Sequence, residues 1–263
     1  MPRPSEDPPK TAKQLLIYES AVPVTVADHG SLSLDTASNH TLSADINAVP
    51  LMAVELPHAA AEYAIVFTAT EDDVIRAAVL GMRNEQYLFL DRNQQWQSKY
   101  IPAFIRRYPF VFAASSDGQR LTLCIDETHP VVNRDGRRMR LFGDEGKPTE
   151  FTDQVLKFLS DYQTQFERTR LIGRLLKELN LLEPMQADIN TPTGEKLTLS
   201  QFHAVSRKKL HSFAPEKPAS LATTDELELI YRHLYSTQNF DDLKDKLLSS
   251  MATSEETGAA ASR

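Results

Sequence analysis

Short apolar runs separated by polar breaks dominate the first half of the chain, and this pattern is typical of β-strands. Residues 64–67 and 74–80 are two such runs, rich in β-branched side chains, and the polar segment 68–73 lies between them. The two runs predict a pair of strands joined as a hairpin. A further apolar run at residues 87–90 predicts another strand.

The strongest hairpin signal lies further along, where residues 109–114 and 120–126 flank the segment Ser115-Ser116-Asp117-Gly118-Gln119. An Asp-Gly pair between two apolar runs favours a tight turn, because glycine adopts a positive φ without steric cost. Together with the earlier runs, this hairpin predicts an antiparallel sheet in the N-terminal part of the protein.

Two short helices are expected among these strands. Residues 101–107 begin with Pro102 in a position where a first helical turn tolerates proline, and they end with Arg106 and Arg107, where a last turn favours cations. Residues 51–63 form the second candidate, since polar side chains recur there at helical spacing.

The second half of the chain changes to a helical period. Between residues 152 and 182 apolar side chains recur at intervals of three and four, which places them on one face of a long helix, and Pro184 is expected to end it. These apolar positions are Val155, Phe158, Leu159, Tyr162, Phe166, Ile172, Leu175, Leu176 and Leu179. Residues 215–218 contain two prolines and predict a linker, and residues 224–234 predict a shorter helix.

These elements predict an α+β fold. A β-rich part with short helices is expected over residues 15–148, and a helical part, made of the long helix and a small C-terminal group of helices, is expected to pack on it over residues 149–248. The proline-rich and charged residues 1–14 predict a disordered leader, and the small, polar residues 249–263 predict a disordered tail.

Composition and charge narrow the choice of function. The chain has 263 residues, of which 41% are hydrophobic and 25% charged, and its formal net charge is −7. An acidic protein is a poor general binder of nucleic acid, because phosphate neutralisation needs a cationic surface. The chain has neither an apolar run long enough to span a bilayer nor a secretory signal at residues 1–14. We therefore expect a cytoplasmic protein, and any association with a membrane would be peripheral. The single cysteine, Cys124, lies in an apolar run and is expected to pack as a buried hydrophobe.

Aromatic and cationic side chains gather near the middle of the chain, and this cluster is the candidate ligand-binding site. Its members are Trp96, Tyr100, Arg106, Arg107 and Tyr108. Aromatic rings at spacings of about four residues usually belong to a core, and Trp96 is expected to be largely buried. The functional alternative is a pocket in which Trp96 and Tyr100 stack on a ligand while either arginine pairs with its carboxylate or phosphate.

No motif in the sequence specifies a reaction. Asp126, Glu127 and His129 could supply metal ligands, but a polar turn after a strand has the same composition, so we predict no bound metal. Glu55 and His58 could form an acid–base pair on a helix, although such pairs are more often surface contacts. Glycine-rich phosphate-binding motifs are absent as well, and the sequence predicts no cofactor and no catalytic residue.

Three blocks of this sequence resemble the SapC family, bacterial proteins named for a surface-array-associated protein and without an established biochemical activity. The blocks are residues 51–57, 96–110 and 121–127, and residues 229–234 resemble the helix near the end of family members. The resemblance implies a link to the bacterial envelope or to nutrient uptake and assigns no chemistry. With the aromatic and cationic cluster as the site, we expect a non-catalytic binding or accessory protein whose partner is a small anionic ligand or an envelope protein. The alternative, implied by the halogenase-like and receptor genes that often accompany the family, is an enzyme or enzyme partner in oxidative modification.

Overall fold

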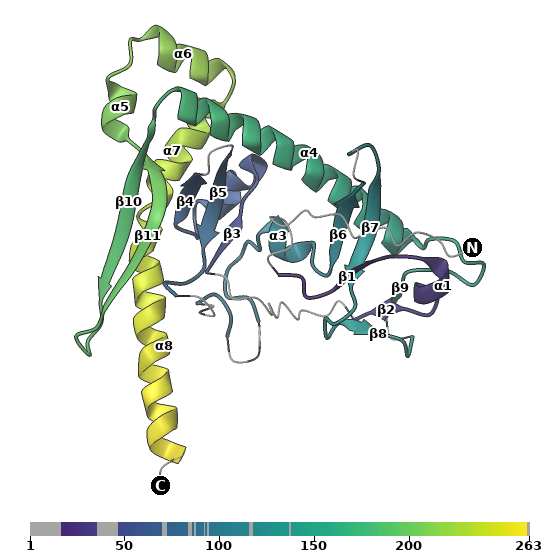
Figure 1. The fold of residues 1–263 in the computed structure, drawn as a ribbon. Helices are drawn as coiled ribbons and strands as arrows, with labels where there is room; N and C mark the ends of the chain where they lie inside the picture. Colours follow the sequence, from purple (N-terminus) through teal and green to yellow (C-terminus); the bar gives the residue numbers. More distant parts are fainter. Residues whose placement is uncertain are drawn as a thin grey trace, which may run out of the picture. The chain divides into compact units, whose positions relative to one another are not determined.

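A computed structural model describes residues 17–35, 47–69, 73–83, 86, 88–91, 93, 95–115, 118–136 and 138–261. The chain forms two compact units (Figure 1). Unit 1 comprises Met1–Ala44 and Arg107–Asp161, and unit 2 comprises Asp45–Arg106 and Tyr162–Arg263. Each unit is therefore assembled from two separate stretches of sequence.

Unit 1 contains two small antiparallel sheets of three strands each. The first has the order β1-β7-β6 and the second β8-β2-β9. Their strands are β1 (Ala21–Pro23), β2 (Ser33–Leu34), β6 (Phe110–Ala114), β7 (Leu121–Asp126), β8 (Val132–Asn133) and β9 (Met139–Arg140), and a short helix α1 (Val26–His29) follows β1. Strands β6 and β7 pair from Phe110 with Ile125 to Ala114 with Leu121, and Gly118 in their connection has a φ of 71°. The predicted hairpin is confirmed, and its glycine has the positive φ that a tight turn was expected to require.

The core of unit 1 lies between these strands and the first part of the long helix α4 (Glu150–Glu178). Phe110 and Ile125 pack there with Leu159 of α4, and partly buried apolar side chains of the same helix surround them. The three-and-four spacing of apolar positions is what gives α4 a face that these strands can bury.

Unit 2 is built on a five-stranded antiparallel sheet with the order β10-β11-β4-β5-β3. Its strands are β3 (Ala48–Pro50), β4 (Ile65–Ala69), β5 (Val74–Val79), β10 (Leu182–Asn190) and β11 (Lys196–Val205). Figure 1 shows β10 and β11 as a long hairpin beside the three shorter strands. The helices of this unit are η1 (Ala53–Glu55), α2 (Leu56–Ala59), α3 (Ala103–Arg106), α5 (Arg207–His211), α6 (Glu216–Thr223), α7 (Glu226–Ser236) and α8 (Asn239–Ala261), together with the rest of α4.

The core of unit 2 forms where helices cover one face of this sheet. Phe67 of β4, Val74 of β5 and Val205 of β11 pack there against Leu176 of α4 and Ile230 of α7. None of the helices in the described residues is both long and apolar enough to cross a membrane.

The predicted α+β class is confirmed, as are the strands expected at residues 64–67 and 74–80 and the short helix expected at residues 101–107, which the structure shortens to α3. The helix expected at residues 51–63 is also present, but only as the short pair η1 and α2. The strand expected at residues 87–90 is wrong. Residues 88–90 form a turn that ends in an isolated bridge between Leu90 and Trp96, and Tyr87 lies outside the described residues.

The expected end of the long helix at Pro184 is also wrong. Helix α4 ends at Glu178, where Asn180 adopts a φ of 51°, a conformation that asparagine tolerates at helix ends. Pro184 lies inside β10, opposite His203 of β11. Because β10 is at the edge of the sheet, a proline without an N–H group is accepted there.

Two further expectations for the C-terminal half are corrected. The expected linker at residues 215–218 falls largely in helix α6, which Pro215 precedes and whose first turn contains Pro218, a position that proline tolerates. The expected helical part also contains the β10–β11 hairpin, and the expected tail is helical from Ser249 to Ala261 within α8. The expected leader at residues 1–14 lies outside the described residues.

Candidate functional site

A buried carboxylate organises the candidate site in unit 2. Glu55 ends η1 and is 3% exposed. Its Oε2 accepts the backbone N–H of Met52 at 2.7 Å, and its Oε1 accepts the N–H of Ala103 at 2.7 Å and the hydroxyl of Tyr100 at 2.8 Å. Burial raises the pKa of Glu55, against the opposing effect of these donors and of nearby Arg106. The carboxylate therefore joins residues 52–55 to residues 100–103.

Tyr100 links the buried Glu55 to two exposed side chains, His58 and Arg106. Its ring stacks on the imidazole of His58, with centroids 5.5 Å apart and planes at 21°. The guanidinium carbon of Arg106 lies 5.6 Å from the Tyr100 ring centroid, and Nη2 of Arg106 is 3.4 Å from the Tyr100 hydroxyl. Nε of Arg106 donates to the carbonyl of Ile101 at 2.9 Å, which fixes the direction of the side chain. His58 and Arg106 are both exposed, so the ring of Tyr100 contacts an imidazole and a guanidinium at the protein surface.

Trp96 is linked to Tyr100 through the hydroxyl of Tyr63. Its indole N–H donates to the hydroxyl of Tyr63 at 2.8 Å, and that hydroxyl donates to the backbone carbonyl of Tyr100. Tyr63 is fully buried, and burial raises its pKa to about 12. The carboxylate of Glu62 accepts the backbone N–H groups of Lys99 and Tyr100 at 2.7 and 3.1 Å. The side chains of Tyr63 and Glu62, together with that of Glu55, therefore hold the segment that contains Tyr100.

The other two predicted site residues belong to unit 1. Arg107 is 3% exposed, and its guanidinium carbon lies 5.8 Å from the ring centroid of Tyr18. Tyr108 donates its hydroxyl to Oδ2 of Asp126 at 3.2 Å, and its ring meets Tyr18 and His129 edge-on. Of the five predicted residues, Trp96, Tyr100 and Arg106 lie together in unit 2, whereas Arg107 and Tyr108 contact a different set of residues.

Asp126 is the acceptor at the centre of that second set. The Thr128 hydroxyl donates to its Oδ1 at 2.7 Å, and the backbone N–H of Glu19 donates to its Oδ2 at 2.7 Å. Burial opposes ionisation of Asp126, but these donors and Tyr108 together hold its pKa below the ordinary value. Asp126 therefore ties the end of β7 to residues near the start of unit 1.

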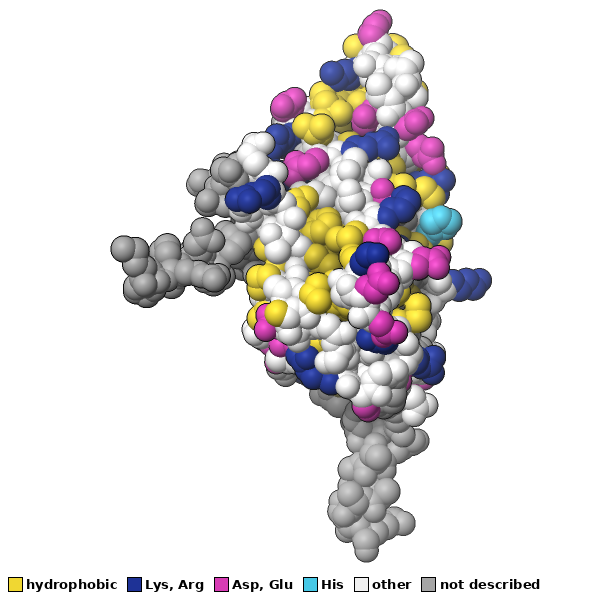
Figure 2. Space-filling model, turned by 90° about the vertical axis from the view of Figure 1, so that its right-hand side faces the viewer, with side chains coloured by type: hydrophobic (Ala, Val, Ile, Leu, Met, Phe, Trp, Pro, Cys, Tyr) yellow, Lys and Arg dark blue, Asp and Glu magenta, His cyan; other side chains and the backbone are white. Residues whose placement is uncertain are grey.

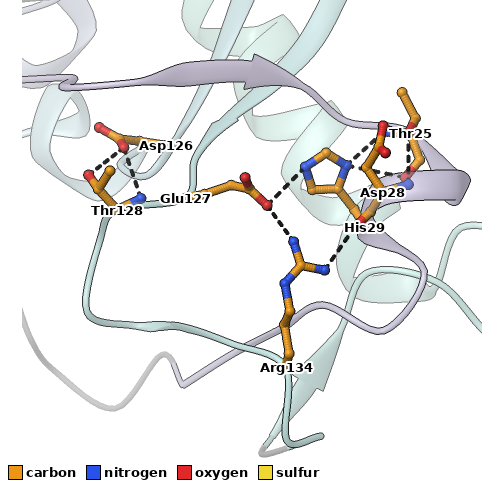
Figure 3. Close-up of polar contacts among 7 residues, drawn as sticks. All are labelled: Thr25, Asp28, His29, Asp126, Glu127, Thr128 and Arg134. Atoms are coloured by element: carbon orange, nitrogen blue, oxygen red, sulfur yellow. Dashed lines mark hydrogen bonds and ion pairs between the residues drawn. The ribbon is translucent and has the colours of Figure 1, made fainter.

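Glu127 and His29 form a separate cluster beside Asp126 (Figure 3). Nε2 of the buried His29 is 3.4 Å from Oε1 of Glu127, and Arg134 approaches the same oxygen at 2.7 Å. Nδ1 of His29 accepts the backbone N–H of Thr25 at 3.1 Å. Arg134 also donates to the carbonyl of Asp28 at 2.8 Å, so this cluster joins α1 to the segment after β7.

The three residues considered as metal ligands therefore have separate partners. Asp126 and Glu127 point to the different groups just described, and Nδ1 of His129 accepts the backbone N–H of Val131 at 3.3 Å. In the part of the chain that the structure describes, no three His, Cys, Asp or Glu side chains come together as a metal-binding group. The acid–base pair considered for Glu55 and His58 is not formed either, because Glu55 is buried against Tyr100 while His58 is exposed.

Sequence reasoning missed Tyr63 and Glu62 as supports of Tyr100, and it did not place Glu55 against Tyr100. Helical spacing placed Glu55, His58 and Glu62 near one another, but it contained no sign that two of these side chains contact residues 99–103. Cys124 is buried, as expected, and burial raises the pKa of its thiol.

Trp96 is half-buried, which corrects the expectation that it is largely buried. Replacing Trp96 with alanine is expected to lower the free energy of unfolding by about 1–3 kcal/mol, because the variant loses one hydrogen bond and part of the contact with Phe89. Urea unfolding followed by far-ultraviolet circular dichroism measures this change, since the variant lacks the sole tryptophan. Trp96→Phe keeps the ring contact and should lose about 1 kcal/mol. A cost above about 4 kcal/mol for the alanine variant would contradict the half-buried placement.

The family model described as SapC matches residues 24–243, most of the chain and both stretches of each unit. No curated protein and no solved structure matches the chain.

Proposed function

This chain belongs to the SapC family, and from that premise we propose that it is a binding protein that holds the carboxylate or phosphate group of a small ligand on a surface made by His58, Tyr100 and Arg106. The observation that carries the proposal is the exposed Arg106 guanidinium held on the ring of Tyr100. We name these three residues the Tyr100 surface.

The chemistry of the Tyr100 surface suits an anion. A guanidinium is always charged and offers planar, paired donors that match a carboxylate or a phosphate. The imidazole of His58 stacks on the same tyrosine ring and offers the ligand a further nitrogen. Most exposed arginines are flexible and lose side-chain entropy on binding, whereas the contact between Arg106 and the carbonyl of Ile101 restricts this side chain in advance.

The surroundings of the Tyr100 surface favour a ligand that also has an apolar part. Val54 is 55% exposed and Pro57 is exposed, and both flank Glu55 and His58 in sequence on η1 and α2. An aromatic or aliphatic acid could place its anionic group at Arg106 and its apolar part against these side chains. The net charge of −7 argues against a long polyanion as the ligand. Figure 2 shows basic and acidic side chains mixed on one face of the molecule.

A thermal-shift assay with matched probes tests this proposal. Benzoate and phenyl phosphate are the anionic probes, and benzyl alcohol is the neutral probe of similar size. We expect the anions to raise the melting temperature in a saturable manner and the alcohol to have no effect, because only the anions pair with Arg106. Arg106→Ala should weaken binding about 10- to 100-fold in calorimetric titrations, as expected for a hydrogen-bonded charge pair.

Arg232→Ala is the matched control. Arg232 is a partly exposed arginine of unit 2, on α7, where it pairs with Glu228 at 2.6 Å. Its removal should leave the affinity for both anions unchanged. If a folded Arg106→Ala variant binds the anions as tightly as the unchanged protein does, the Tyr100 surface is not the binding site.

A further inference from the structure

Unit 2 contains an arginine in its core. Arg76 lies on β5 and is 2% exposed, and neither Nη1 nor Nη2 has a hydrogen-bond partner among the residues that the structure describes. Burial lowers the pKa of Arg76 to about 10, so the guanidinium remains charged at neutral pH. A buried charge is normally paired, because removing it from water without a counter-charge is strongly unfavourable.

His233 of α7 is a second buried group in the same region. Its Nε2 accepts the backbone N–H of Val205 at 3.0 Å, so the proton of the neutral ring lies on Nδ1. Burial, followed by the positive charge of Arg76, lowers the pKa of His233 to about 3, against the opposing effect of a hydrogen bond with the backbone of Ile65. The ring therefore stays neutral and does not add a second charge beside Arg76.

The sheet register places His203 on the same face of the sheet as Arg76. Phe67 of β4 pairs with Arg76 on one side and with His203 of β11 on the other, and paired residues of antiparallel strands direct their side chains to the same face. The Phe67 ring contacts both the Arg76 guanidinium, at 5.8 Å, and the His233 ring, at 4.7 Å. Nδ1 of His203 is also buried and has no hydrogen-bond partner in the described part of the chain.

No acidic side chain among the described residues balances the positive charge of Arg76. Desolvation is the one influence on the pKa of Arg76, and no carboxylate among the described residues contributes to the pKa of either Arg76 or His233. Elsewhere in unit 2 the chain does pair its arginines, since Arg170 meets Asp73 through Nε and Nη2, both at 3.0 Å. The guanidinium of Arg76 is therefore a buried charge without an acidic partner among the described residues.

We propose that Arg76 binds a small monovalent anion, a halide or the carboxylate of a small acid, within unit 2. The anion would accept hydrogen bonds from Nη1 and Nη2 of Arg76. It would supply the negative charge that the surrounding side chains do not. This anion site involves no residue of the Tyr100 surface, so either proposal can fail without the other.

Chlorine-35 nuclear magnetic resonance of the full chain tests the anion site, because the chloride signal broadens when the ion exchanges with a bound state. We expect saturable excess broadening with the unchanged protein and at least a tenfold smaller excess with Arg76→Met. Arg76→Lys keeps the charge and should retain part of the broadening. Competition with bromide, formate and acetate distinguishes the two sources: displacement by bromide alone indicates a halide site, and displacement by formate or acetate indicates a carboxylate site.

Arg170→Met is the matched control, since it removes a partly buried and paired arginine of the same unit, and it should leave the excess broadening unchanged. A second measurement does not depend on any variant. The melting temperature of the unchanged protein should rise with chloride at constant ionic strength when chloride replaces the bulkier isethionate. Broadening that is equal in a folded Arg76→Met variant, or a melting temperature that no probe anion changes, would overturn the proposal.

Discussion

Replacing Glu55 with alanine is expected to lower the free energy of unfolding of unit 2 by about 3–5 kcal/mol. The variant leaves the backbone N–H groups of Met52 and Ala103 and the hydroxyl of Tyr100 without their acceptor, and each buried group that loses its partner costs about 1–3 kcal/mol. Urea unfolding followed by Trp96 fluorescence measures this loss, because the sole tryptophan lies in unit 2.

The cost of Glu55→Ala should also depend on pH. Burial raises the pKa of Glu55 above its ordinary value of 4.5, so the folded protein binds the Glu55 proton more tightly than the unfolded chain does. The stability from this difference is fully present below pH 4.5 and is lost as the pH rises through the folded pKa. The difference between the unchanged protein and Glu55→Ala should therefore be largest near pH 4 and decrease as the pH rises, and an increase with pH would contradict this interpretation.

Glu62→Ala is the control for this variant. Glu62 also accepts two backbone N–H groups, but its side chain is only half-buried, so water can replace it. We expect a loss of about 1 kcal/mol. Equal losses for the two variants would show that burial of Glu55 does not govern the effect.

Replacing Gly173 with alanine is expected to destabilise unit 2 by about 2–3 kcal/mol, although the same change in an exposed helix stabilises it by about 1 kcal/mol. Gly173 lies in α4, and a Cβ atom there would be 2.1 Å from the carbonyl oxygen of Val74 on β5. It would also be 3.1 Å from the carbonyl carbon and the Cβ of Val74. Because the obstacle is mainly backbone of a central strand, no side-chain rotation relieves the overlap, and helix and strand must separate.

Urea unfolding followed by Trp96 fluorescence measures the effect of Gly173→Ala as well. Leu171→Ala serves as the control, since Leu171 lies two residues earlier on the same helix and is 63% exposed. That variant should change the free energy of unfolding by less than about 0.5 kcal/mol. A stabilising Gly173→Ala change would mean that α4 does not contact β5 at this position.

Local patterns in the sequence were sufficient for much of the fold. The Asp-Gly signal predicted the β6–β7 hairpin, because a turn and the two runs beside it form from neighbouring residues. Apolar spacing predicted α4 for the same reason, since a helix places residues three and four apart on one face. The family resemblance is also carried by short blocks, and the match over residues 24–243 confirms it.

Long-range pairing explains the errors. Pro184 was expected to end a helix, but β11 supplies a partner for β10 and places this proline at a sheet edge. The apolar run at residues 87–90 did not become a strand, because its described residues turn and form only the bridge to Trp96. A run of apolar residues does not show whether another strand is available to pair with it.

In the candidate site, too, local sequence patterns determined some features and long-range contacts determined others. By itself the sequence determined that aromatic rings and two arginines are concentrated between Trp96 and Tyr108, and that this block belongs to the SapC family. Only the tertiary structure decided that Arg106 is exposed on Tyr100 while the adjacent Arg107 is buried beside Tyr18. The physical reason is that consecutive residues of a helical turn point in different directions, and which direction meets solvent depends on residues that are distant in sequence.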